Sequence, residues 1–232
     1  IKQLLGNNER DQPLFIATLS VTNHPPYQLP KHHGLTLSPL ADSLSERLQD
    51  LPAESLDTYR YTNDQLGQFM SAIKDSRLKG NTIVVATGDH AIRGMSYNPA
   101  ERLHELSVPF YLYLPINYRP NLRPDTNQIG SHKDIMPTLY NAALSNARYP
   151  NLGRNLLAPK RNENHHSFAY HAEYLVIGET AYSKGGQGRK VTPEFMLVPN
   201  AINTENIPDR GQVYSQTIDW LTRFQLTNGP ID

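Results

Sequence analysis

The stretch Thr82-Ile83-Val84-Val85-Ala86-Thr87-Gly88-Asp89-His90 decides the fold. Its first six residues are apolar or β-branched without polar alternation, which is typical of a strand buried on both faces. In an open α/β sheet, residues that follow the carboxyl end of a strand face a crevice. A carboxylate beside an imidazole can bind a divalent cation, so Asp89 and His90 are candidate metal ligands. This stretch alone leaves open that Asp89 caps the next turn and that His90 is a loop residue.

A second apolar run lies upstream, Leu14–Val21, and it is followed by Thr22-Asn23-His24-Pro25-Pro26-Tyr27. We expect another strand here, with the two prolines stiffening the loop that carries His24. On its own, His24 could be an ordinary turn residue. If both strands are parallel, however, the residues at their ends converge on one edge of the sheet.

A third candidate segment is Ile129–Tyr140. The pattern predicts a helix in which Asp134 is the N-cap and Pro137 lies in the first turn. Ser131 and His132 would lie just before that helix. They are candidate substrate contacts, although for His132 a simple lead into the cap is the alternative.

The rest of the chain alternates predicted helices and strands. Residues 31–60 are polar and irregular, and Thr62–Lys79 is an expected amphipathic helix with a capping box at Thr62 and Gln65. Val108–Leu114 reads as a buried strand, preceded by a loop that contains His104.

The carboxyl third predicts an antiparallel hairpin or meander at the sheet edge, with strands in Ser167–Gly178 and Glu194–Pro199. Lys184–Lys190 lacks the spacing of a phosphate-binding loop and is expected to be a basic hairpin tip. Residues 211–226 predict a final helix that covers the sheet.

Composition limits the possible functions. The 232 residues include 22 Lys plus Arg and 22 Asp plus Glu, so no net charge attracts nucleic acid or an anionic membrane. The chain has no cysteine, which excludes disulfides and thiolate metal sites. No stretch approaches the ~20 apolar residues of a membrane helix, so we expect any membrane anchor to lie upstream.

Several segments resemble, in order, the catalytic domain of the sulfatase family within the alkaline phosphatase superfamily. The resemblance is closest to its lipoteichoic acid synthase and phosphoglycerol transferase branch, and it covers roughly residues 14–157. The matching segments are Thr18–Tyr27, Tyr61–Phe69, Asn81–His90, Val108–Pro115, Ser131–Leu139 and Leu152–Leu157.

The resemblance implies roles for individual residues. Asp89 and His90 would be two ligands of a catalytic divalent cation, and His24 would contact the ester that is cleaved or transferred. His132, Ser131 and His104 are further candidate substrate-binding residues, and for His104 a surface position is the alternative. The mixed carboxylate and imidazole ligands suit Mn, Mg or Ca, and Zn remains an alternative.

The resemblance also implies the architecture: an α/β protein, a three-layer α/β/α sandwich with a mostly parallel central sheet, alkaline phosphatase-like and truncated at the N-terminus. Residues 1–232 would be the carboxyl-terminal portion of one catalytic domain, with the metal-site half in 1–160 and an edge hairpin and final helix in 161–232. The family's nucleophile and a further acidic ligand precede the segment where this chain begins. We therefore expect this chain alone to be inactive.

The parent protein is expected to be a metal-dependent sulfatase-like hydrolase of sulfate or phosphate esters. Its setting would be extracytoplasmic, in a membrane-anchored bacterial protein, with a glycan or phospholipid headgroup as a further candidate partner and no nucleic acid. One alternative is a phosphoglycerol or phosphoethanolamine transferase of cell-envelope glycans or lipids. Another is a non-catalytic binding module with a decayed site, since Ala91 stands where relatives usually have glycine or an aromatic residue.

Overall fold

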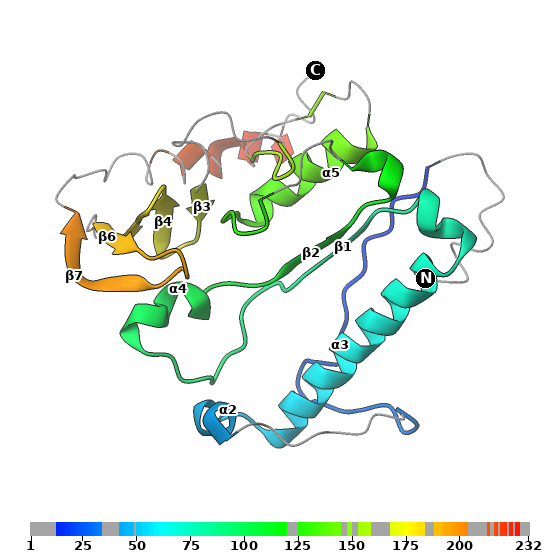
Figure 1. Ribbon diagram of the computed structural model, residues 1–232, viewed down its shortest axis with the longest axis horizontal. Coiled ribbons are helices and arrows are strands. Elements are labelled where there is room, and N and C mark those ends of the chain that lie inside the picture. Colours follow the sequence, from blue (N-terminus) through cyan, green and yellow to red (C-terminus); the bar gives the residue numbers. More distant parts are fainter. Residues whose placement is uncertain are drawn as a thin grey trace.

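The computed structural model describes residues 13–33, 42–48, 50–119, 125–144, 148–149, 153–158, 168–183 and 188–203, with separate positions between 213 and 227. Two sheets are present in this part of the chain, and in the view of Figure 1 α5 and α3 lie on opposite sides of the smaller one. The helices are α2 (Asp42–Arg47), α3 (Ala53–Lys74), α4 (Arg102–Glu105) and α5 (Ile135–Ala143), with 3₁₀ turns η1 (Arg77–Gly80), η2 (Pro99–Glu101), η3 (Ile116–Tyr118) and η4 (His132–Asp134). The strands are β1 (Val84–Thr87), β2 (Phe110–Tyr113), β3 (Phe168–Tyr170), β4 (Tyr174–Ile177), β5 (Thr180–Ser183), β6 (Gly188–Val191) and β7 (Leu197–Asn203).

The smaller sheet contains the two strands predicted within residues 82–114. β1 and β2 pair in antiparallel register, from Val84 opposite Tyr113 to Thr87 opposite Phe110. The expectation of a mostly parallel sheet is therefore not met, since the described strands all pair antiparallel. An apolar run predicts burial, but it carries no information on the direction of the neighbouring strand. The predicted full burial is also wrong, because the residues of β1 and β2 are half-buried and Thr87 and Tyr111 are exposed.

The apolar segment 14–21 differs from its prediction. It has no regular strand structure, and Phe15 and Leu19 are 74% and 78% exposed. A strand needs a neighbouring backbone for its hydrogen bonds. Within the described residues no strand pairs with this segment. The apolar composition of segment 14–21 was therefore not enough to predict a strand.

Helix α3 begins earlier than predicted. It starts at Ala53 rather than at Thr62, and it ends at Lys74, before η1. The predicted capping role of Thr62 is wrong, because its hydroxyl donates to the carbonyl of Thr58 inside the helix (2.8 Å). The stretch predicted to be irregular thus contains α2 and the first turns of α3.

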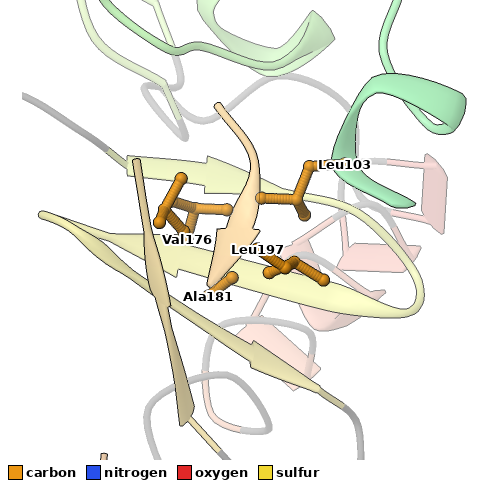
Figure 2. Packing of buried hydrophobic residues seen from close by; sticks show 5 residues of the cluster. Leu103, Val176, Ala181 and Leu197 are labelled. Carbon is orange, nitrogen blue, oxygen red and sulfur yellow. The ribbon is translucent and has the colours of Figure 1, made fainter. Parts of the chain in front are cut away.

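The carboxyl third confirms an antiparallel meander, β3-β4-β5-β6-β7, but as a separate sheet rather than an edge of the first. Figure 2 shows how Leu103 of α4 packs with side chains of this sheet. The buried cluster consists of Leu103, Val176, Ala181, Val191 and Leu197. Burial of each leucine or valine contributes roughly 1.5–3 kcal/mol, so this cluster ties α4 to the meander.

Two carboxyl-terminal predictions are modified. Gly188, Arg189 and Lys190 belong to β6 instead of a hairpin tip, and residues 184–187 lie outside the described part. The described positions between 213 and 227 are helical, as predicted, yet Val213 and Trp220 are 57% and 59% exposed. These two side chains therefore do not bury against the sheet. Among the helices that the structure describes, none has the length and apolar character of a membrane span.

Candidate metal centre at the end of strand β1

The predicted metal-ligand pair lies just past the end of β1. Gly88 begins the exit, and a Cβ there would lie tightly against Cγ1 of Val108, at 3.1 Å. The backbone N–H of His90 donates to Oδ1 of Asp89 (2.9 Å). The side chains of Asp89 and His90 are 73% and 59% exposed. Both groups are therefore accessible at the rim of the sheet.

The geometry of this pair suits a shared cation. Nδ1 of His90 lies 2.8 Å from the carbonyl of Ala91, and a carbonyl can only accept, so Nδ1 carries the proton. In the neutral ring, Nε2 then holds the lone pair that a metal needs, and it lies 4.0 Å from Oδ2 of Asp89. Ligands at about 2.0–2.2 Å from one ion are themselves about 3–3.6 Å apart, so both exposed side chains reach the same cation after moving together by about half an ångström.

The pair is only part of a metal site. Within the described part of the chain, no group of three or more His, Cys, Asp or Glu side chains could hold a metal ion. Asp89 and His90 can thus supply two ligands, and a complete coordination shell needs others.

His132 lies next to this pair although it is far away in sequence. Its Nε2 donates to the backbone carbonyl of Gly88 at 2.8 Å. The structure therefore joins η4 to the residue that directly precedes Asp89. The predicted position of His132, just before the helix, is confirmed to the extent that it opens η4, while its role in substrate binding stays a prediction.

A buried polar network holds η4 in place, and Asp134 is its centre. Asp134 occupies the predicted N-cap position of α5, but its side chain makes no capping bond to that helix. Its carboxylate instead accepts from the backbone N–H groups of Ser131 and Arg154, both at 2.9 Å, and from Nζ of Lys133 at 2.6 Å. The hydroxyl of Ser131 accepts from the backbone N–H of Tyr170 (2.9 Å). Ser131 therefore links η4 to β3.

Two residues that carry no obvious functional signal in the sequence complete this network. A Cβ at Gly153 would collide with the carbonyl oxygen of Lys133, so only glycine fits there. Nη2 of Arg154 donates to the carbonyls of Ile129 and Phe168. Burial lowers the pKa of Lys133, against the opposing effect of its bond to Asp134, and burial also lowers the pKa of Arg154. The only sequence signal for Gly153 and Arg154 was their place in the last matching segment.

His24 lies in a loop that is bonded to the first half of α3. Its Nδ1 donates to the carbonyl of Pro25 (2.9 Å), and the adjacent Asn23 accepts a hydrogen bond from Thr58 of α3 (3.2 Å). The His24 ring is therefore oriented by its own loop, with Nε2 as the nitrogen left for other partners. Its contact with an ester stays a prediction.

His104 lies against the meander. Its Nε2 is 2.8 Å from the carbonyl of Glu194, and its ring meets Phe195 edge-on with centroids 6.0 Å apart. The structure thus brings His132 next to Asp89 and His90, and Ser131, the residue before His132, is bonded to β3. His104 instead contacts the turn before β7.

Known proteins are similar to this chain in sequence and in fold. The family model "Sulfatase" matches residues 1–145, which is more than half of the chain. This chain belongs to the sulfatase family. Among curated relatives of this sulfatase-family chain, lipoteichoic acid synthase 1 of Bacillus subtilis (strain 168) is 25% identical over 224 residues, covering 91% of the chain and 31% of the relative. The lipoteichoic acid synthase-like protein YvgJ of the same organism is 27% identical over 143 residues, covering 55% of the chain and 22% of the relative.

Solved structures give the fold of this sulfatase-family chain. The lipoteichoic acid synthase LtaP from Listeria monocytogenes matches with a TM-score of 0.59 and 19% identity, over 91% of this chain and 53% of that one. A protein of the alkaline phosphatase superfamily from Vibrio parahaemolyticus matches with a TM-score of 0.58 and 18% identity, over 91% and 48%. The α/β fold and the resemblance to the lipoteichoic acid synthase branch are thereby confirmed. The chain spans less than a third of the length of the curated relatives.

In this sulfatase-family chain, the loop after His90 is fastened to α2. The carbonyl of Arg47 accepts from the backbone N–H of Ser96 (2.8 Å), and the Arg47 guanidinium donates to the Ser96 carbonyl (3.1 Å) and to Glu101 (2.9 Å). The backbone N–H of Asn98 and the Arg47 guanidinium together hold the pKa of Glu101 below its usual value. Sequence reasoning missed Arg47, because it lies in the stretch that was predicted to be irregular.

Proposed function

We propose that this chain supplies two metal ligands, Asp89 and His90, to a site that cleaves or transfers a phosphate or sulfate ester. The observation that carries the proposal is their geometry at the end of β1, in a chain that belongs to the sulfatase family. The remaining ligands and the nucleophile would come from parts of the full-length protein that lie outside this chain.

The chemistry of such esters explains the residue types. A nucleophile must approach an anionic centre, and a bound divalent cation lowers that barrier by neutralising charge on the ester oxygens. Asp89 and His90 would hold and orient the ion. His24 would face the ester with Nε2, because Nδ1 is engaged by Pro25, and it would donate a proton or hydrogen bond from that atom.

Among the possible reactions, we favour transfer of a phosphoglycerol group over hydrolysis. Both curated relatives carry lipoteichoic acid synthase in their names, and one of them aligns with 91% of the chain. The full-length protein would then act outside the cytoplasm as a membrane-anchored enzyme, with a phospholipid headgroup as donor.

The test measures turnover by the full-length protein with added Mn, Mg or Ca. The substrates are an aryl phosphate, an aryl sulfate and a glycerophosphodiester. We expect metal-dependent release from the phosphodiester, and loss of that release in Asp89→Ala. The matched control is Asp64→Ala, which removes an exposed carboxylate of α3 that bonds Gln68.

Calorimetry with Mn separates an enzyme from a decayed binding module. Asp89→Ala should lose a manganese site that wild type and Asp64→Ala retain. Equal heats for all three proteins, or no metal-dependent turnover of any ester, would contradict the proposed function.

A further inference from the structure

The hydrogen bond from His132 to Gly88 acts on the peptide unit that carries the metal ligands. The carbonyl of Gly88 and the N–H of Asp89 belong to one planar peptide group. Because Nε2 of His132 holds that carbonyl at 2.8 Å, it also fixes the plane from which the Asp89 side chain departs. A rotation of this plane would move the Asp89 carboxylate relative to the His90 ring.

Gly88 also lies close to Val108, so there is little room for a side chain at this position. A Cβ at this residue would lie 3.1 Å from Cγ1 of Val108 and 3.3 Å from the carbonyl oxygen of His90. The segment that leads into β2 thus lies on one side of Gly88, and the His132 ring bonds the carbonyl of the same residue. Packing of Val108 limits how close the backbone can approach, whereas the hydrogen bond sets its orientation.

His132 itself stands on a rigid base. The next turn of chain contains Asp134, whose side chain is fully buried and bonded to Ser131, Lys133 and Arg154. The Nζ of Lys133 lies 4.7 Å from the ring centre of Phe168, which ties the base to β3. An exposed ring on such a base can transmit a fixed position to a loop that has few buried contacts of its own.

We propose that His132 is a positioning residue for the Asp89–His90 metal-ligand pair, acting through the Gly88 carbonyl. This inference rests on the proposed function, because it assigns His132 to the support of that metal site instead of to substrate contact. The Nε2–H group of His132 donates to the Gly88 carbonyl, so this nitrogen orients the backbone before Asp89. Supporting residues of this kind typically affect metal affinity by about 10–100-fold.

The test compares His132→Leu with His132→Gln in the full-length protein. The two side chains have similar bulk, but only glutamine carries an N–H that can donate to Gly88. By calorimetry, the manganese dissociation constant should rise about 10–100-fold in His132→Leu and return to within about threefold of wild type in His132→Gln. At saturating Mn, the KM for the ester should stay near the wild-type value in both variants.

The control variant is His171→Leu, which removes another exposed histidine with a backbone partner, the N–H of Glu173 at 3.2 Å. It should leave manganese affinity unchanged. Melting temperature is measured for every protein, and His132→Ala serves as a second variant without a donor if His132→Leu does not fold.

Two results would overturn the inference, and they differ from failure of the proposed function. Unchanged manganese affinity in the donor-less variants would show that His132 does not position the ligands. A raised ester KM with unchanged manganese affinity would make His132 a substrate contact. If Asp89→Ala also keeps wild-type manganese heats, the proposed function itself fails, and this inference fails with it.

Discussion

His132 connects two aspartates: it bonds the Gly88 carbonyl just before Asp89, and Asp134 follows it by two residues in η4. The surroundings of the two carboxylates differ completely. The Asp89 side chain is 73% exposed, and one of its oxygens accepts the N–H of the next residue. Asp134 has no exposed surface, and its carboxylate accepts from two backbone N–H groups and one lysine. One carboxylate is available to a ligand, whereas the other is used entirely within the protein.

The two aspartates therefore have different roles: Asp89 can bind a ligand at the surface, and Asp134 stabilises the structure below it. A charge that is buried must be paired, because desolvation is costly, so Asp134 can hold its neighbours firmly but cannot bind anything else. Asp89 keeps its solvent and can exchange it for a cation. Between them, His132 is exposed itself but is anchored next to Asp134. The following substitutions test this division, from the largest expected effect on stability to the smallest.

Asp134→Ala should destabilise the protein most. It leaves the N–H groups of Ser131 and Arg154 and the largely buried Lys133 ammonium without their carboxylate, which costs about 3–5 kcal/mol. The free energy of unfolding, measured by denaturant titration and circular dichroism, should fall by that amount. The control Asp89→Ala should change it by no more than about 0.5 kcal/mol. Similar losses in both variants would break the comparison.

Gly153→Ala should have the next largest effect. The added methyl group would collide with the Lys133 carbonyl, so the backbone around Asp134 must move. We expect a loss of about 1–3 kcal/mol in the free energy of unfolding. Gly67 in α3 is the matched control, because nothing lies within 4 Å of the position that a Cβ would take there. Gly67→Ala should stabilise the helix by about 0.5–1 kcal/mol, and destabilisation there as large as at Gly153 would contradict the packing argument.

Glu101→Gln should have the smallest effect, and one that depends on pH. The pKa of Glu101 is lowered in the folded protein, so its contribution to stability is present above the ordinary value of 4.5 and is lost as the pH falls through the folded pKa. Wild type should therefore melt slightly above Glu101→Gln at pH 7, and this difference should vanish in strong acid. Thermal unfolding between pH 7 and pH 3 measures it. A difference that grows on acidification would contradict the assigned cause.

The local parts of the fold could be predicted from sequence, but their pairing could not. The runs at residues 82–87 and 108–114 contain β1 and β2, because β-branched and aromatic residues favour strands wherever a neighbour is present. The antiparallel direction of this pair was missed, since an apolar pattern is the same for either orientation. The carboxyl-terminal meander was predicted, but its forming a sheet of its own was not. The segment 14–21 shows the limit most clearly: its apolar residues predicted a strand that the described structure does not form.

The sequence by itself determined the family and the two adjacent ligand types at the end of an apolar strand, because both depend on which residues are neighbours along the chain. Only the tertiary structure decided that His132 reaches Gly88, 44 residues away, and that Asp134 is bonded to the N–H of Arg154, 20 residues away. Such contacts depend on how the chain returns on itself. Hydrogen bonds of this kind form only after burial has brought distant segments together, so no local pattern of residue types records them.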